Sequence, residues 1–379
     1  MHRPLGADHA RVTPSDALLR LALVPGIGPV LAGRLSAAVD GDLAAIFRWN
    51  MDRLQQIEGI GAEKARRICD PRADEQVASE RARCAAAGVQ ILTCHDPGWP
   101  KDLANLPDPP LALWMLGQLE PRDRLAVAVV GPRRASAYGH RIAQRLSTGL
   151  ARVGATVVSG LARGVDTAAH EAALATNGRT VAVLGSGIGR CYPEENRPLA
   201  ERIAAGAGAV LSEMPYDAQP TPGTFPRRNR LVAALSLATL VVEAGETSGA
   251  LITARLAGEL GKQVLVVPGP IDRPEHVGSN KLIRDGAVLV TSLDDILAEV
   301  GPLATLAGAM PAEAVSRPAA AALSGRERQL FQLLDDTTRS IDDVVRATGI
   351  PASAVSATLL SLELKRLARK APGGFVRAD

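Results

Sequence analysis

The sequence has few aromatic residues, little net charge and no apolar run of membrane-spanning length. Phe, Trp and Tyr make up 3% of the 379 residues, and the formal net charge is +3 at pH 7. A protein that coats duplex DNA through its bulk charge is usually more basic, so a nucleic-acid site here would have to be a local patch. Apolar runs such as LAVAVV at 125–130 are far too short to cross a bilayer.

Cysteine is also scarce. The four cysteines, at positions 69, 84, 94 and 191, form no C-x-x-C pair, which argues against a zinc site and against a secreted disulfide scaffold. Residues 1–17 lack the apolar stretch of a signal peptide. We therefore expect a globular protein of the cytoplasm, with no metal and no membrane contact.

Residues 15–70 contain two similar segments, LALVPGIGPVLAGRL and LQQIEGIGAEKARRI. Each places Gly-Ile-Gly between two helical patterns, where glycine permits a tight turn and frees the backbone amides at the next helix start. This arrangement resembles a SAM-like helix-hairpin-helix pair, and we assign a helical domain of this kind to residues 1–90. Its amides could bind phosphate, or the pair could be a plain helical domain.

Residues 91–300 favour an α/β domain with a Rossmann-like, doubly wound and mostly parallel sheet. Segments rich in Val, Leu and Ala recur between helical patterns, which is typical of strands buried on both faces. The expected strands are LAVAVVG, TVVSG, TVAVLGSG, AVLSEMP, TLVVEAG, QVLVVPG and VLVTS. Residues 95–124 contain six prolines and are interpreted as an extended connector that leads into the sheet.

The last part of the chain predicts a linker and a third domain. Residues 301–322 are mostly small and are interpreted as the linker. Three short amphipathic helical patterns and a Gly-Gly hairpin follow over 323–379, an order that indicates a winged helix. Its expected recognition helix has basic groups only at its end, at Lys365 and Arg366, so we favour a protein-contact or auxiliary DNA role over reading of the major groove.

The expected strand ends are rich in glycine and serine. Ligands of a doubly wound sheet bind at the carboxyl ends of its strands. Glycine lets an anion approach the backbone, while serine hydroxyls and backbone amides donate to phosphate oxygens. The residues expected to contact phosphate in this way are Ser159, Gly160, Gly164, Ser186, Gly187, Ser248 and Gly249.

Arginines fall at the same strand ends, and the planar guanidinium suits phosphate. Those expected at the site are Arg133, Arg134, Arg163, Arg227, Arg228 and Arg230, together with Asn229. The alternative is that some of them, Arg230 above all, form structural ion pairs with Glu213 or Glu243.

Each of the four aromatic residues between 125 and 300 lies at or beside a strand-to-helix loop. Arginines combined with loop aromatics are typical of sites for single-stranded nucleic acid, because the rings stack with bases. We expect base stacking by Tyr138, Tyr192 and Phe225. The alternative is that these rings only cover the edge of the sheet.

The same residues could instead belong to a nucleotide site or an enzyme active site. The G-x-G-x-x-G fingerprint is absent after the first strand and no Walker A motif occurs, so we expect no nucleotide cofactor. Asp166 and His170 share a helix face but lack an evident third ligand, so we interpret them as helix capping and packing. An enzymatic alternative is a nucleotide N-glycosidase with Glu213 and Glu243 as its acid and base.

The motifs in their order resemble the DNA-processing protein A family, also called DprA or Smf. They include VVGPRRASAYG, VVSGLARGVDTAAHEAAL, TFPRRNRLVAALS, VVEAGETSGALITARLAGELGK and GSNKLIRDGA. The resemblance is unbroken from about 95 to 290, and the helical front and winged-helix tail also fit it.

The resemblance implies a protein that is not an enzyme and that binds single-stranded DNA on its Rossmann-like domain with little sequence preference. It implies that the protein protects incoming strands in natural transformation and loads a RecA-type recombinase onto them, as a homodimer through that domain. A single-strand-binding protein is a further candidate partner.

The resemblance also implies roles for single residues. Arg133 occupies the arginine of the VGxR motif, Arg163 the basic position of SGLAxGxD, and Arg227, Asn229 and Arg230 match FPxRNR. Lys281, in GSNKLIRDGA, is a further candidate DNA contact. Two departures stand out: Pro132 replaces a common threonine, and Glu194 and Glu195 argue against a DNA contact from the YPEEN loop.

Overall fold

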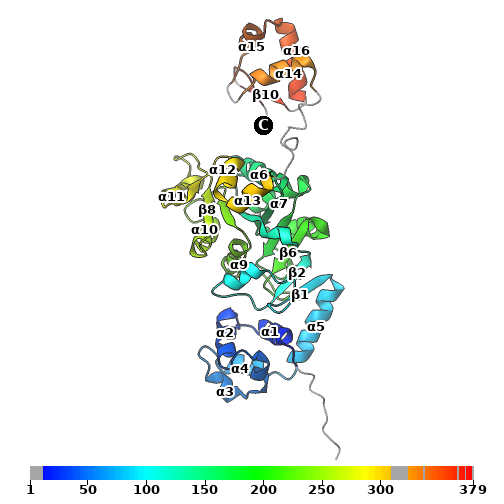
Figure 1. The fold of residues 1–379 in the computed structure, drawn as a ribbon, viewed down its shortest axis with the longest axis vertical. Coiled ribbons are helices and arrows are strands. Elements are labelled where there is room, and N and C mark those ends of the chain that lie inside the picture. Colours follow the sequence, from blue (N-terminus) through cyan, green and yellow to red (C-terminus); the bar gives the residue numbers. More distant parts are fainter. Residues whose placement is uncertain (1–11, 309–322, 336–337, 365–366, 372, 378–379) are drawn as a thin grey trace, which may run out of the picture. The chain divides into compact units, whose positions relative to one another are not determined.

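The chain separates into two compact units, Met1–Ala309 and Met310–Asp379 (Figure 1). The computed structural model describes residues 12–308, 323–335, 338–364, 367–371 and 373–377. The first unit contains a helical N-terminal part and an α/β part, and the second contains the winged helix. Most of the sequence predicted as a linker, 309–322, lies outside the described residues.

The N-terminal part is the expected pair of helical hairpins. Its helices are α1 (Pro14–Ala22), α2 (Pro29–Ala37), α3 (Met51–Gln55) and α4 (Ala62–Ile68), followed by the longer α5 (Ala73–Ala86). The first glycine of each Gly-Ile-Gly turn has a left-handed backbone, with φ of 82° at Gly26 and 89° at Gly59, which a residue with a side chain rarely adopts. Leu21, Leu35 and Leu54 form the core between the hairpins.

A nine-stranded sheet forms the α/β part, in the order β1-β2-β6-β5-β4-β3-β7-β8-β9. The seven strands predicted from the sequence are confirmed, and they run parallel from β6 to β9. They are β3 (Ala126–Val130), β4 (Thr156–Ser159), β5 (Thr180–Leu184), β6 (Gly208–Ser212), β7 (Ala238–Val241), β8 (Gln263–Val266) and β9 (Val288–Leu289).

Two further strands were missed in the sequence. β1 (Val89–Leu92) and β2 (Leu113–Gly117) pair antiparallel with each other, and β2 pairs antiparallel with β6. The prediction of an extended connector over 95–124 is therefore wrong at β2. Trp114 in β2 is fully buried and its Nε1 donates to the Glu80 carboxylate of α5 at 2.9 Å, so this strand also joins the helical part to the sheet.

Helices cover both faces of the sheet, as the doubly wound prediction requires. One face packs against α9 (Thr224–Ala234), α10 (Gly249–Glu259) and α11 (Val277–Arg284), and the other against α6 (Ala137–Arg152), α7 (Val165–Ala175), α12 (Leu293–Glu299) and α13 (Gly301–Gly308). Alternate residues of β3 point to opposite faces, with Ala128 in one core and Val129 in the other. Residues 301–308, predicted as linker, instead form α13 and bury Leu303. A third core forms at the β6 side of the sheet and includes α8 (Arg197–Arg202).

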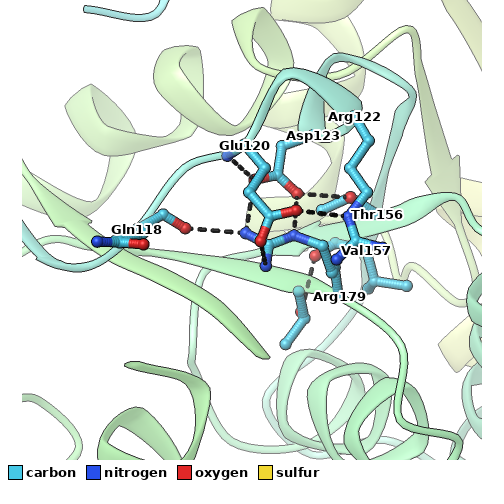
Figure 2. Close-up of polar contacts among 8 residues, drawn as sticks. Gln118, Glu120, Arg122, Asp123, Thr156, Val157 and Arg179 are labelled. Carbon is cyan, nitrogen blue, oxygen red and sulfur yellow. Dashed lines mark hydrogen bonds and ion pairs between the residues drawn. The ribbon is translucent and has the colours of Figure 1, made fainter. Parts of the chain in front are cut away.

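A buried ion-pair network closes the amino-terminal edge of the strands (Figure 2). The Arg179 guanidinium, just before β5, donates to both carboxylate oxygens of Asp123 at 2.7 and 2.8 Å and to Glu120 at 2.8 Å. Thr156, the first residue of β4, donates to Asp123 at 2.8 Å. The network thus fixes the starts of three strands at the edge opposite the expected ligand site.

The second unit is the expected winged helix. It contains α14 (Gly325–Leu333), α15 (Ile341–Thr348), α16 (Ala352–Leu364) and the hairpin β10 (Ala368–Ala371) and β11 (Gly374–Arg377). Its own core includes Leu330, Val355 and Leu359. Lys365 and Arg366, the basic end of the expected recognition helix, lie outside the described residues. Among the described helices none is both long and apolar enough to cross a membrane by itself, and α15 with α16 pass that test only as a pair bent by 112°.

Candidate nucleic-acid interface

A groove of about 1060 Å³ opens at the carboxyl ends of the central strands. Its floor comes from the loops after β3, β4 and β7. The chain places β4 to β6 on one side of β3 and β7 to β9 on the other, so the groove lies at the point where the strand order reverses, which is where ligands of such sheets bind. The sequence-predicted site residues that line it are Arg133, Arg134, Gly160, Tyr192, Phe225, Arg228, Asn229, Ser248 and Gly249.

Arg133 and Arg134 follow β3 and are the freest cations of the groove. Both side chains are exposed, and among the residues that the structure describes neither has a carboxylate partner. The Arg133 guanidinium lies 4.8 Å from the centre of the Phe225 ring, and the Phe225 and Tyr192 rings are 5.6 Å apart. Cations without a carboxylate partner beside two aromatic rings can hold a phosphate and a base together.

Phe225 takes this position because residue 185 is glycine. A Cβ atom at Gly185 would lie 2.8 Å from the Phe225 ring, closer than van der Waals contact allows. Phe225 is the second residue of α9, which also carries Arg227, Arg228 and Arg230 in the next turn.

Arg228 lies beneath the groove and is hydrogen-bonded within the protein. Its side chain is buried, and its NH1 donates to the carbonyls of Gly160 and Val183. Burial lowers the pKa of Arg228, as does the positive charge of the nearby Arg133. Two neighbouring guanidinium groups make this part of the groove attractive to an anion, although Arg228 has few donors left for direct contact.

Arg230 and Arg227 share one carboxylate. Arg230 is buried and donates to Glu213 at 2.6 Å and to Asp108 at 3.0 Å, while the half-exposed Arg227 donates to Glu213 at 2.9 Å. The alternative of a structural ion pair is thus confirmed for Arg230, with Glu213 as its partner. Arg227 lies outside the groove, beside Gly28 at the start of α2.

Arg163 lies at the rim of the groove and is also paired. Its Nε donates to Glu195 in the short helix Glu194–Asn196, and both side chains are about half exposed. The Arg163 hydrogen bond holds the pKa of the Glu195 carboxyl below its ordinary value.

The glycines and serines of the neighbouring loops are mostly buried or hydrogen-bonded within the protein. Ser159 and Ser186 are fully buried, and the Ser159 hydroxyl donates to the Val129 carbonyl at 2.7 Å. The Gly160 amide donates to Asp166 at 3.1 Å and the Gly187 amide to the Ala218 carbonyl at 2.9 Å. Their donors therefore do not face the groove, which corrects the expectation that they contact phosphate.

Three other predicted residues lie outside the groove or its floor. Gly164 caps the start of α7 with φ of 77°, Tyr138 donates its hydroxyl to the Pro268 carbonyl at 3.1 Å, and Lys281 is exposed on α11. By contrast, Ser248 and Gly249 begin α10 at the groove wall. Residues 220–222 and Pro274, Glu275 and Val277 also line the groove but were not predicted, because they carry neither glycine nor arginine.

Asp166 and His170 hold the loop and the core. Asp166 accepts from the Gly160 and Ala162 amides, so it fastens the loop after β4 rather than capping its own helix. Burial raises the pKa of the Asp166 carboxyl. His170 is fully buried, with Nδ1 2.6 Å from the Thr180 hydroxyl, and desolvation lowers its pKa to about 3. His170 is therefore neutral and packed in the core, as expected.

The geometry excludes Glu213 and Glu243 as the acid and base of the glycosidase alternative. Glu213 follows β6 and Glu243 follows β7, and three strands separate these two in the sheet. Four strand spacings of about 4.8 Å separate the backbones of the two glutamates by about 19 Å, too far for an acid and base pair that glycosidic cleavage needs at roughly 5–10 Å. Glu213 is also occupied by two arginines, and Glu243 accepts from the Ser136 amide and hydroxyl.

Comparison with known proteins gives the family. The sequence model described as DNA recombination-mediator protein A matches residues 90–301. The chain belongs to the DNA recombination-mediator protein A family. Models for a SAM-like helix-hairpin-helix tandem and for the DprA winged helix domain match residues 18–71 and 314–374.

Relatives and solved structures in this family cover most of the chain. Protein Smf of Synechocystis is 34% identical, over 92% of this chain and 95% of its own. DNA processing protein A of Streptococcus pneumoniae superposes with a TM-score of 0.65 at 33% identity, over 77% of this chain and 99% of its own. DNA processing protein A of Helicobacter pylori, described for its single-stranded DNA binding mode, superposes with a TM-score of 0.50 at 33% identity, over 58% of this chain and 96% of its own.

Proposed function

We propose that this protein binds single-stranded DNA in the groove and acts as a recombination mediator in DNA processing. The observation that carries the proposal is a pair of exposed arginines, Arg133 and Arg134, that have no carboxylate partner among the described residues and line the same groove as the adjacent rings of Phe225 and Tyr192. Arginine holds the backbone and the rings stack with bases, which gives affinity without sequence preference. Membership of the family and the DNA-binding mode described for the H. pylori relative support this function.

The finer parts of the proposal follow from the family resemblance. The protein works in the cytoplasm as a homodimer through its α/β part, protects incoming strands in natural transformation, and loads a RecA-type recombinase onto them. A single-strand-binding protein is a second candidate partner. The groove needs neither a nucleotide cofactor nor a catalytic residue for this role. The proposed DNA contacts in the groove are Arg133, Arg134, Asn229, Ser248 and Gly249, with stacking by Phe225 and Tyr192. Arg163 at the rim, and Arg227 and Lys281 outside the groove, are proposed as further contacts along the strand.

The test is Arg133→Gln measured against Arg124→Gln. Arg133 follows the end of β3, whereas the exposed Arg124 comes just before β3 begins, so the pair removes the same charge at opposite edges of the sheet. Loss of a charge-assisted hydrogen bond is worth about 1.5–3 kcal/mol, so Arg133→Gln should weaken binding to a labelled oligothymidylate tenfold or more in fluorescence anisotropy. Arg124→Gln should leave it nearly unchanged.

The salt dependence gives a second readout of the same variants. For single strands the slope of log K against log salt is about −0.7 per phosphate contacted, so Arg133→Gln should reduce the slope by about that amount. Equal affinities and slopes for the two variants would exclude this edge of the sheet as the DNA site.

A further inference from the structure

The ion pair between Arg163 and Glu195 lies beside the groove. The neighbouring residue Ala162 and, three positions before Glu195, Tyr192 both line it. The two charged side chains are 52% and 53% exposed, so a backbone phosphate bound in the groove can reach this rim. The preceding residue, Glu194, is exposed like Glu195, but within the described residues it has no ion-pair partner.

The loops that carry the pair are joined independently of it. The buried Asn196 donates to the Leu161 carbonyl at 2.8 Å and to the Thr167 hydroxyl at 2.9 Å. These bonds hold the helix Glu194–Asn196 against the loop after β4. Removal of the Glu195 charge therefore leaves the position of Arg163 largely unchanged and alters only what its guanidinium pairs with.

An internal carboxylate opposes DNA binding in two ways. It occupies the Nε donor of Arg163, and its negative charge repels a phosphate that approaches the same guanidinium. Exposed ion pairs are weak, so a phosphate can displace Glu195 but binds less tightly than it would to a free arginine.

Building on the proposed function, we propose that Glu195 sets the affinity of the groove for single-stranded DNA by competing with the strand backbone for Arg163. The competition keeps binding reversible, which suits a protein that must pass its strand to a recombinase. It also gives the acidic part of the YPEEN loop a role, although neither Glu194 nor Glu195 makes a favourable contact with DNA.

The test compares Glu195→Gln with Glu194→Gln, which removes the same charge from the adjacent residue. Because exposed pairs are worth at most about the equivalent of a fivefold change, Glu195→Gln should tighten oligothymidylate binding about two- to fivefold at low salt. It should also steepen the slope of log K against log salt by up to about 0.7, because the charge of Arg163 is then no longer neutralised by a carboxylate in the free protein. Glu194→Gln should change both quantities much less.

A second arm uses Arg163→Gln alone and combined with Glu195→Gln. If the competition is for Arg163, the gain from Glu195→Gln disappears in the Arg163→Gln background. Equal gains in affinity for the two glutamate variants, or a gain that persists in the Arg163→Gln background, would overturn the inference. The proposed function would still hold in that case, provided that the wild-type protein binds single-stranded DNA. Absence of wild-type binding to single-stranded DNA would overturn both. Thermal unfolding of every variant checks that the fold is unchanged.

Discussion

Arginines that look alike in the sequence have three different environments at this sheet edge. Arg133 and Arg134 are exposed and have no carboxylate partner among the described residues, Arg163 and Arg227 are exposed but paired, and Arg228 and Arg230 are buried. Arg133 and Arg134 can bind phosphate without giving up a carboxylate, and Arg163 gives up only the exposed Glu195, whereas Arg227 would have to leave the buried Glu213. Charge alone therefore overstates the number of DNA contacts.

The Phe225 ring should contribute to binding through stacking. We expect Phe225→Leu to weaken oligothymidylate binding by about 1–3 kcal/mol, the usual loss per stacked base, with little change in salt dependence because no charge is removed. Fluorescence anisotropy over a salt series measures both quantities. A change in slope as large as that of Arg133→Gln would contradict a stacking role.

His170 should make the fold sensitive to acid. Its folded pKa of about 3 lies below the ordinary value of 6.5, so the unfolded state takes up the proton first. Stability from this residue is complete above pH 6.5 and falls as the pH drops toward 3, by up to about 1.4 kcal/mol per pH unit.

The measurement is urea unfolding between pH 5 and 6.5 for wild type and His170→Asn, whose amide can replace Nδ1. The variant should show the weaker loss of stability with falling pH. Asp166 has a raised pKa and so acts in the opposite direction, but it is present in both proteins. Parallel curves for the two proteins would show that His170 is not the titrating group.

At the scale of elements, the two edges of the sheet have opposite properties. The amino-terminal edge is closed by the Arg179 network, in which five hydrogen bonds join buried or half-buried groups (Figure 2). The carboxyl-terminal edge leaves cations exposed. Stability and binding are therefore separable by mutation.

Arg179→Met should destabilise the protein by about 3–5 kcal/mol, because it leaves the buried Asp123 carboxylate without a counter-charge. Arg122→Met is the control, since Arg122 is 62% exposed and pairs with Glu120 at the surface; it should cost less than about 0.5 kcal/mol. Chemical denaturation measures both. Similar losses for the two variants would mean that the network is not the source of stability.

The turn into α7 depends on a glycine. Gly164 has φ of 77°, and a Cβ there would lie 2.3 Å from the Pro132 carbonyl, so Gly164→Ala should destabilise by about 1–3 kcal/mol. Gly258→Ala, in an exposed helical position with no atom within 4 Å of the added Cβ, should instead stabilise by about 0.5–1 kcal/mol. Thermal unfolding distinguishes the two, and a stable Gly164→Ala variant would show that this loop can rearrange.

At the scale of the whole molecule, each compact unit has its own core. The core of the winged helix contains residues of that unit only. We expect a protein truncated to residues 1–309 to fold and to bind oligothymidylate within about twofold of the full chain, since the groove lies entirely in the first unit. Circular dichroism and anisotropy measure this, and a large loss of affinity would assign part of the DNA site to the winged helix.

The sequence by itself determined what is locally encoded. Runs of Val, Leu and Ala predicted the seven parallel strands, the Gly-Ile-Gly turns predicted the helical hairpins, and the amphipathic patterns after 323 predicted the winged helix. The motifs after β3 and β4 correctly identified the edge of the sheet at which the groove lies. Residue type and spacing suffice for these features because they depend on backbone preference and on which face is apolar.

The tertiary structure decided what depends on contacts between distant segments. Only the strand order shows that three strands separate Glu213 from Glu243 and that β2 joins the sheet next to β6. Only the packing shows that the Ser159 hydroxyl is buried and that Glu195 pairs with Arg163. Pairing partners and burial are set by the whole fold rather than by neighbouring residues, so the sequence located the edge of the sheet while the fold selected which of its side chains are free to bind.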